Sequence, residues 1–155
     1  MTELKRILLA EDNPNDVELA LEALNQHNLA NEVVVANDGV EALDYLYYRN
    51  KFAARAGGLP AVVLIDLKMP RVDGVEVLRQ IKSDPQLRSI PVVILTSSRE
   101  EPDLKKCYDL GCNAYVVKPV DFQQFAGTVS KLGCFWAIIN EPPPANVIEI
   151  GRAHV

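Results

Sequence analysis

The chain has 155 residues, a formal net charge of −5 at neutral pH and 48% hydrophobic residues. This length suits one domain, and the hydrophobic share is too high for a disordered chain. The acidic balance excludes a chain-wide attraction to nucleic acid or anionic lipid, because both need clustered Lys and Arg. We therefore expect one globular domain that binds neither nucleic acid nor membrane.

The sequence contains no apolar run near the roughly 20 residues that span a bilayer, and its start leads into a strand-like segment rather than a signal sequence. These features predict a cytoplasmic protein. Cys107, Cys112 and Cys134 are odd in number and lack metal-ligand spacing, so we expect reduced, partly buried thiols. We assign no role to His27 or His154, which lie far from the predicted strand ends.

Short β-branched runs alternate with helical periodicity, a pattern typical of a parallel sheet covered by helices on both faces. The expected strands are 6–10, 32–36, 61–65, 91–95 and 114–117, and the expected helices are 14–26, 39–48, 74–82, 102–110 and 121–139. The third and fourth strands are continuously apolar, so they should be central. The predicted fold class is therefore α/β, with five βα units in a doubly wound sheet.

Two segments fall outside this pattern. Residues 49–60 have no clear period and should form an exposed loop. Three consecutive prolines at 142–144 cannot continue a helix and should run extended. We expect the domain to cover residues 1–140 and a proline-containing tail to cover 141–155, whose last five residues form no recognisable element and would fit an added, non-native segment.

Polar residues follow four of the five predicted strands. In an open parallel sheet the functional site lies beyond the carboxyl ends of the strands. Glu11 and Asp12 follow the first strand, Asp66 the third, Thr96 the fourth and Lys118 the fifth. We expect these side chains to meet at one rim of the sheet.

Three carboxylates at contact distance repel one another by roughly 4 kcal/mol per pair at an effective dielectric constant near 20. A hard divalent ion such as Mg²⁺, which prefers carboxylate and water ligands, would offset this repulsion. Lys118 adds a positive charge and Thr96 adds a hydroxyl donor. A carboxylate nucleophile with these partners can carry out phosphoryl transfer, and Asp66, on a central strand, is the natural acceptor.

The order and spacing of these motifs resemble the receiver domain of two-component response regulators over about residues 5–132. This resemblance implies the flavodoxin-like (βα)5 fold. It rests on the following pairs and single residues: Glu11-Asp12, Asp66, Met69-Pro70, Asp73-Gly74, Thr96-Ser97 and Lys118-Pro119.

The resemblance also implies how Asp66 is phosphorylated. In the family the acidic pair, the acceptor and a backbone carbonyl two residues after it hold Mg²⁺. These positions correspond to Glu11, Asp12, Asp66 and the carbonyl of Lys68. Mn²⁺ is expected to substitute for Mg²⁺. Because the family's conserved lysine contacts the phosphoryl group, Lys118 would have that role.

The same resemblance implies a switch. Thr96 matches the family's Thr/Ser that turns towards the phosphoryl group, and Tyr115 matches the aromatic residue that follows this movement. Lys118-Pro119 matches the family's cis peptide. The alternatives are that Thr96 caps the following helix and that Tyr115 serves packing alone.

Two residues depart from the family's usual pattern. Lys68 lies two positions after the acceptor, where a small or amide side chain is common, and Ser98 lies two positions after Thr96 in place of a longer side chain. Both positions are close to the route of hydrolytic water in the family. We expect Lys68 and Ser98 to set the lifetime of the acyl phosphate, with slow hydrolysis.

The last predicted helix has a second apolar face, formed by Phe135, Ile138 and Ile139. This face indicates a homodimer through the last helices and the tail, unless the tail folds back to cover it. A long last helix that ends in Phe-Trp before prolines also resembles stand-alone regulators paired with phytochrome-type histidine kinases. A bacteriophytochrome is therefore the candidate kinase.

The leading hypothesis is a single-domain response regulator, a signalling protein rather than an enzyme, that takes a phosphoryl group from a histidine kinase. The alternative is a Mg²⁺-dependent phosphatase of the haloacid-dehalogenase type. That class needs Asp-x-Asp at the nucleophile, whereas Asp66 is followed by Leu67 and Lys68. A flavodoxin-like FMN binder would need Ser, Thr and Gly in the first turn, where Glu-Asp-Asn stands.

Overall fold

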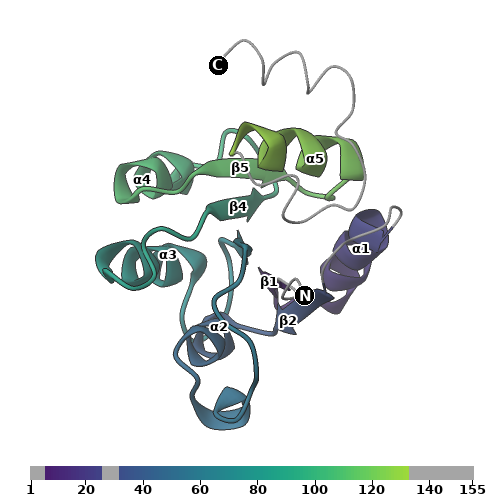
Figure 1. The fold of residues 1–155 in the computed structure, drawn as a ribbon. Coiled ribbons are helices and arrows are strands. Elements are labelled where there is room, and N and C mark those ends of the chain that lie inside the picture. Colours follow the sequence, from purple (N-terminus) through teal and green to yellow (C-terminus); the bar gives the residue numbers. More distant parts are fainter. Residues whose placement is uncertain (1–5, 26–31, 133–155) are drawn as a thin grey trace.

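The computed structural model describes residues 6–25 and 32–132 (Figure 1). The strands are β1 (Arg6–Ala10), β2 (Glu32–Ala36), β3 (Val62–Asp66), β4 (Val92–Thr96) and β5 (Ala114–Val117). The helices are α1 (Pro14–Asn25), α2 (Gly39–Leu46), α3 (Gly74–Ser83), α4 (Asp103–Leu110) and α5 (Phe122–Lys131), with a short 3₁₀ helix, η1 (Asn50–Phe52). The five strands and the five α-helices follow the predicted order, whereas η1 was not predicted.

All five strands are parallel and lie in the order β2-β1-β3-β4-β5. The chain moves outward from β1 to β2 and then crosses back to β3, so the winding reverses between β1 and β3. Ligand sites of open α/β sheets lie at this reversal. β3 and β4 are buried along their whole length, which confirms that they are central. The doubly wound, flavodoxin-like fold is thus the observed one.

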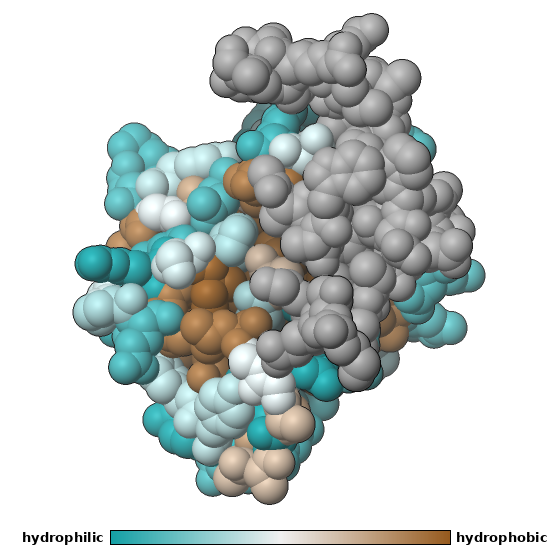
Figure 2. All heavy atoms as spheres, viewed as in Figure 1, coloured by the Kyte–Doolittle hydropathy of each residue, from teal (hydrophilic) through white to brown (hydrophobic). Residues whose placement is uncertain are grey.

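Helices cover both faces of the sheet, with α1 and α5 on one side and α2, α3 and α4 on the other (Figure 1). Successive strand residues point to opposite faces. In β3, Val63 and Ile65 accordingly pack with α2, α3 and α4, whereas Val62 and Leu64 pack with α1 and α5. Figure 2 shows apolar residues gathered in the middle of the face drawn, with hydrophilic residues around them.

Side-chain caps and a glycine mark three of the helix ends. The Asn13 side chain accepts hydrogen bonds from the backbone N–H groups of Asn15 and Asp16, at 2.9 and 3.2 Å, and so caps α1. Gly111 ends α4 with a φ of 106°, a left-handed conformation that favours glycine. Asp38 precedes α2 and caps it, because its side chain accepts a hydrogen bond from the Glu41 N–H.

The structure shifts several predicted boundaries by one or two residues. β3 and β4 each begin and end one residue later than expected, because ladder pairing continues through the register Asp66–Leu95 and Thr96–Val117. Asp66 and Thr96 therefore end their strands rather than follow them. The second helix stops at Leu46, not at residue 48, since Tyr48 has a positive φ of 55° that an α-helix cannot contain.

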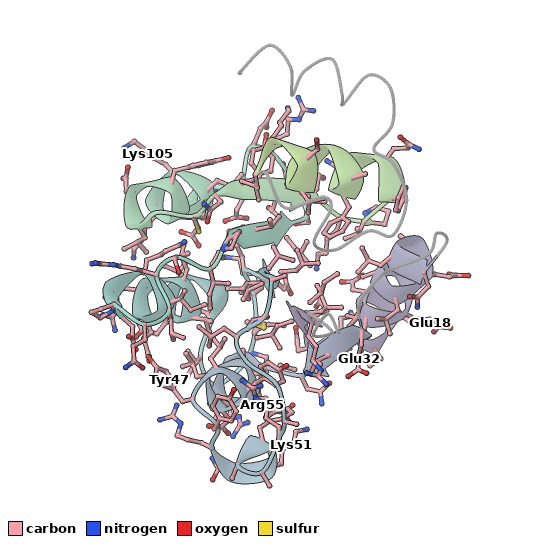
Figure 3. All side chains as sticks on the ribbon, in the orientation of Figure 1. Glu18, Glu32, Tyr47, Lys51, Arg55 and Lys105 are labelled. Carbon is pink, nitrogen blue, oxygen red and sulfur yellow. The ribbon has the colours of Figure 1, made fainter. Side chains whose placement is uncertain are left out.

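The predicted loop at 49–60 is more ordered than its lack of period suggested. Besides η1, the Arg55 guanidinium lies 3.8 Å from the ring centres of both Tyr45 and Tyr48. Its Nε also donates to the Tyr45 carbonyl at 2.8 Å, and in Figure 3 Arg55 lies against α2. Cation–π contacts of this kind hold the loop on the helix without any sequence period.

The last predicted helix, 121–139, is described as far as Lys131. Phe122, Phe125, Ala126 and Val129 lie on one stripe of this helix and are buried against the sheet. The dimer residues Phe135, Ile138 and Ile139, the tail 141–155, Cys134, His27 and His154 lie outside the described residues.

The two described thiols agree with the prediction. Cys107 and Cys112 are free and buried, and burial raises the pKa of each to about 11. Both therefore stay protonated at neutral pH. Among the helices within 6–25 and 32–132, none has the length and apolar character needed to cross a bilayer.

The backbone packs closely around Gly74, the first residue of α3, and a substitution there can test this packing. A Cβ at this position would lie 2.4 Å from the Asp66 carbonyl oxygen and 2.9 Å from the Leu67 Cα. Because backbone atoms cannot move aside cheaply, Gly74→Ala should lower the free energy of unfolding by about 1–3 kcal/mol. Denaturant unfolding followed by circular dichroism measures this loss.

Gly58→Ala is the matched control, because nothing lies within 4 Å of its added Cβ and its backbone is not left-handed. Its unfolding free energy should stay within about 0.5 kcal/mol of wild type. Equal losses in the two variants would contradict the steric argument.

Candidate functional site

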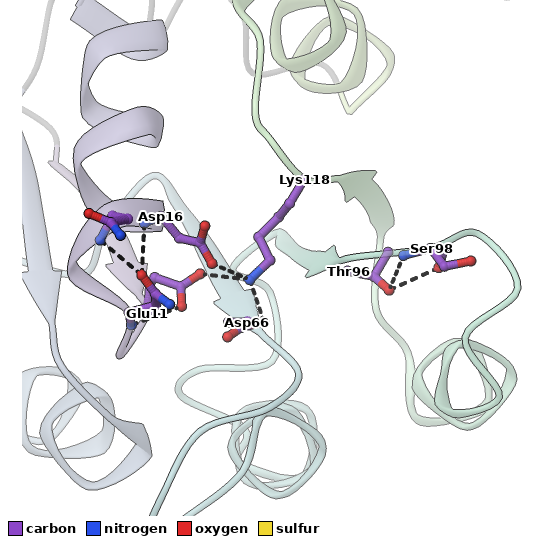
Figure 4. A network of polar contacts seen from close by, with 8 residues as sticks. Glu11, Asp16, Asp66, Thr96, Ser98 and Lys118 are labelled. Carbon is purple, nitrogen blue, oxygen red and sulfur yellow. Dashed lines mark hydrogen bonds and ion pairs between the residues drawn. The ribbon is translucent and has the colours of Figure 1, made fainter.

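Three strand ends bring the predicted site residues together (Figure 4). Glu11 follows β1 and its N–H donates to the Ala36 carbonyl at 3.0 Å. Asp66 ends β3, and the Lys118 N–H, just after β5, donates to the Thr96 carbonyl at 2.7 Å. The Lys118–Pro119 peptide is cis, as the resemblance predicted.

The Lys118 ammonium contacts three carboxylates. Its Nζ lies 3.2 Å from Glu11 Oε1, 3.3 Å from Asp66 Oδ1 and 2.9 Å from Asp16 Oδ2. The residues Glu11 and Asp66 are only 1% and 5% exposed. Buried charges are costly unless they are paired, so Lys118 compensates for the repulsion between these carboxylates.

Burial raises the pKa of Glu11 to about 7, and its hydrogen bond with Asp66 and the Asp66 charge act in the same direction. The Asn13 N–H and the Lys118 charge oppose this rise. For Lys118, burial would lower the pKa, but the hydrogen bond to Asp16 and the charges of Asp66 and Glu11 raise it above its ordinary value. The lysine therefore stays protonated throughout the physiological pH range.

The acidic cluster has the chemistry of a divalent cation site. Glu11, Asp12 and Asp66 each offer a carboxylate oxygen, and these oxygens lie within 4.8 Å of one another. Asp12 is exposed whereas the other two are buried, so the cluster faces solvent on the Asp12 side. Hard oxygen donors of this kind fit Mg²⁺ or Mn²⁺.

Thr96 lies away from this cluster. It is 2% exposed, and its Oγ1 donates to the Ser98 carbonyl at 2.9 Å and accepts from the Ser98 N–H at 3.3 Å. Figure 4 shows both contacts on the far side of Lys118. The alternative that Thr96 caps the next helix is wrong, because α4 begins at Asp103 after Pro102.

Tyr115 lies on β5, beside α4. Its ring meets the ring of Tyr108 edge-on, with the ring centres 6.4 Å apart. Tyr115 is half-buried and packs against the core, whereas Tyr108 is 48% exposed. The aromatic residue of the predicted switch thus borders the surface formed by α4 and β5.

The Lys68 side chain is 71% exposed and reaches the start of α4. Its Nζ lies 3.5 Å from Asp103 Oδ2 and 3.7 Å from Glu101 Oε1. The charge of Glu101 is the largest of the effects that raise the pKa of Lys68. The residue two positions after the predicted acceptor is thus an ionic link between the loop after β3 and α4.

Asp16 is the site residue that the sequence analysis missed. It lies in the first turn of α1, five residues beyond Glu11, rather than directly after a strand. The cap formed by Asn13 and the helical geometry that follows it place this carboxylate over the strand ends. The sequence signal was therefore an acidic residue one helical turn beyond the acidic pair.

Comparison with known proteins identifies relatives of this chain. The profile of the response regulator receiver domain matches residues 7–130. The probable methanogenesis regulatory protein FilR2 of Methanothrix harundinacea is 40% identical over 139 residues, which cover 88% of this chain and 86% of FilR2. Response regulator Rcp1 of Synechocystis is 35% identical over 132 residues, covering 85% of this chain and 88% of Rcp1.

Solved structures of response regulators are also similar to this chain. The bacteriophytochrome response regulator AtBRR has a TM-score of 0.83 and 61% identity over 90% of this chain and all of its own. The phosphorylated cyanobacterial phytochrome response regulator RcpA has a TM-score of 0.71 and 39% identity, covering 92% and 100% of the two chains. Mn²⁺-bound Rcp1 has a TM-score of 0.70 and 34% identity, covering 91% and 99%.

The receiver fold of these relatives is consistent with the five-stranded parallel sheet of this chain. None of these matches supports the haloacid-dehalogenase alternative. The similarity extends to the narrower group expected from the sequence, because AtBRR and RcpA are both phytochrome response regulators. The chain belongs to the response regulator receiver domain family, with phytochrome response regulators among its close structural neighbours.

Proposed function

We propose that this receiver domain accepts a phosphoryl group from a histidine kinase on Asp66. The observation that carries the proposal is the position of Asp66, buried at the end of a central strand with the Lys118 ammonium 3.3 Å from its Oδ1. An Asp66 oxygen would attack phosphorus as the bond from phosphorus to the histidine nitrogen breaks. Lys118 would then neutralise charge on the phosphoryl oxygens.

Glu11, Asp12, Asp66 and the backbone carbonyl of Lys68 would hold Mg²⁺, or Mn²⁺ in its place. When bound, the cation supplies positive charge to the phosphoryl oxygens. The oxygen cluster of the first three residues and the Mn²⁺-bound form of the relative Rcp1 support this part of the proposal. Lys118 occupies one oxygen each of Glu11 and Asp66.

The response to phosphorylation would begin at Thr96. Its hydroxyl would leave the Ser98 carbonyl and turn towards the phosphoryl group, and Tyr115 would follow into the space beside β4. The protein would then signal through its changed surface, and slow attack by water on the acyl phosphate would reset it. Such a cycle is that of a phosphoacceptor rather than of an enzyme with turnover of a free substrate.

The kinase partner would be of the phytochrome type. Receiver domains act with histidine kinases, and three of the most similar solved structures are phytochrome or bacteriophytochrome response regulators. The specific kinase would be identified by comparing phosphotransfer rates from purified bacteriophytochrome kinases and unrelated histidine kinases.

Asp66→Asn should abolish labelling by radioactive acetyl phosphate, because the amide cannot act as the nucleophile. Excess EDTA should likewise abolish labelling of wild type. Asp109→Asn is the control, since this carboxylate is exposed on α4 and contacts only Lys105 among the described ion pairs. Persistent labelling of the Asp66 variant would disprove the assignment, and undiminished labelling in EDTA would disprove the cation requirement.

Lys68 should lengthen the life of the acyl phosphate, because a phosphoryl group two residues away would compete with Glu101 and Asp103 for its ammonium. Lys68→Asn should then speed dephosphorylation by more than about twofold, a change of ~0.4 kcal/mol in barrier. Lys105→Asn is the control, since Lys105 is 87% exposed and points away from the domain in Figure 3. A smaller change in the Lys68 variant would rule this role out.

The protein would signal in part by forming a homodimer. Each chain would consist of a receiver domain at 1–140 and a tail at 141–155. Besides the apolar residues 135, 138 and 139, the described surface supports this proposal. A hollow of about 310 Å³ lies between α4, β5 and α5, and the exposed Tyr108 and the partly buried Leu132 line it. A two-fold interface would cover such a surface on both subunits at once.

Sedimentation velocity tests the dimer. Ile138→Asp with Ile139→Asp should dissociate it, because burial of each isoleucine contributes roughly 1.5–3 kcal/mol that a charged side chain cannot supply. Leu59→Asp is the control, an exposed apolar residue in the loop before β3. A monomeric wild type at micromolar concentration, or an unchanged dimer in the double variant, would show that the face has another purpose.

A further inference from the structure

Asp16 makes the shortest of the three contacts to the Lys118 ammonium, at 2.9 Å against 3.2 and 3.3 Å. It belongs to α1, whereas the other two carboxylates lie at the ends of β1 and β3. Figure 4 shows the ammonium between Asp16 on one side and Asp66 on the other. Asp16 thus gives the Lys118 ammonium a partner on α1 in addition to the two buried carboxylates.

We propose that Asp16 is a positioning residue that keeps the Lys118 ammonium from displacing a divalent cation. The inference rests on the cation site of the proposed function. Without Asp16, the only described carboxylates within reach of Lys118 would be Glu11 and Asp66, the two buried carboxylates that the cation needs. The ammonium and the cation would then compete for the same oxygens.

Local charge supports this division of roles. Glu11, Asp12 and Asp66 supply three carboxylates to the cluster, and one ammonium cannot neutralise them. Asp16 adds a fourth carboxylate, which pairs with Lys118 and is not one of the predicted cation ligands. The lysine therefore has an ion-pair partner outside the predicted cation site. Its ammonium contacts one oxygen each of Glu11 and Asp66, and the second Glu11 oxygen accepts the Asn13 N–H at 3.2 Å.

A purely structural role for Asp16 is a weak alternative. The cap of α1 is the Asn13 side chain, which accepts the N–H groups of both Asn15 and Asp16. The Asp16 carboxylate is therefore not the capping group, and its side chain is 31% exposed. An acidic residue in a first helical turn also interacts favourably with the helix dipole, but that effect would not depend on Lys118.

The test is Mn²⁺ binding by the unphosphorylated full chain, measured from the electron paramagnetic resonance signal of free Mn²⁺. Asp16→Asn keeps the shape of the side chain and removes its charge, and should weaken Mn²⁺ binding by about threefold or more. Asp16→Glu should restore most of the affinity. Glu18→Gln is the control for charge alone, because Glu18 is exposed on the same helix and points away from the site (Figure 3).

A double-mutant cycle separates positioning from the general electrostatic field. In a Lys118→Met background, adding Asp16→Asn should change Mn²⁺ affinity no more than Glu18→Gln does in wild type, since no ammonium remains to position. An equal loss in both backgrounds would overturn the inference, because Asp16 would then act through its field alone. An unchanged affinity for Asp16→Asn in the wild-type background would overturn it too.

The outcome can be distinguished from failure of the proposed function. Mn²⁺ binding needs no phosphoryl transfer, so a protein that binds Mn²⁺ but is not labelled on Asp66 would still decide the role of Asp16. A wild type that binds no Mn²⁺ would overturn both the proposed cation site and this inference. If circular dichroism shows that Lys118→Met does not fold, the comparison of Asp16→Glu with Asp16→Asn decides the role of Asp16. Equal Mn²⁺ affinities in these two variants would overturn the inference.

Discussion

The electrostatic balance at the carboxyl ends of β1, β3 and β5 constrains the rest of this molecule. Two nearly buried carboxylates meet an exposed one there, and each pair at contact distance repels by roughly 4 kcal/mol at an effective dielectric constant near 20. Lys118 compensates for part of this repulsion. The remaining negative charge makes the cluster suitable for a divalent cation, and a partly buried ammonium beside a carboxylate is suitable for stabilising phosphoryl oxygens.

Close backbone packing under the site holds this arrangement in place. α3 begins at Gly74, where a side chain would meet the Asp66 carbonyl, and α2 begins at Gly39, where a side chain would meet the Val72 carbonyl. The loop after β3 is therefore held against the starts of two helices. Arg71 adds an ion pair with Asp38, the cap of α2. Asp66, the proposed acceptor, is thus followed by a loop that packs closely against the starts of α2 and α3.

The sequence predicted the features that depend on local pattern. Apolar runs marked the strands, and the rule that sites follow strand ends placed Glu11, Asp66 and Lys118 together. Features that depend on tertiary contacts were not predictable in this way. Asp16 follows no strand, and the Arg55 contacts with two tyrosines have no sequence period. The ion pairs of Lys68 depend on where α4 begins relative to β3, which no spacing along the chain specifies.

The site and α4 are joined by a short chain of polar contacts. The Ser98 carbonyl accepts both the Thr96 hydroxyl and the Glu101 N–H, at 2.9 and 3.2 Å, and the Glu101 carboxylate pairs with Lys68. A phosphoryl group on Asp66 would attract both the hydroxyl and the ammonium, so it would weaken two supports of the β4–α4 loop at once. Exposed ion pairs contribute only about 0–1 kcal/mol each. Phosphorylation would therefore change the populations of two conformations of α4 by a modest amount. The packed core beneath the helix would remain unchanged.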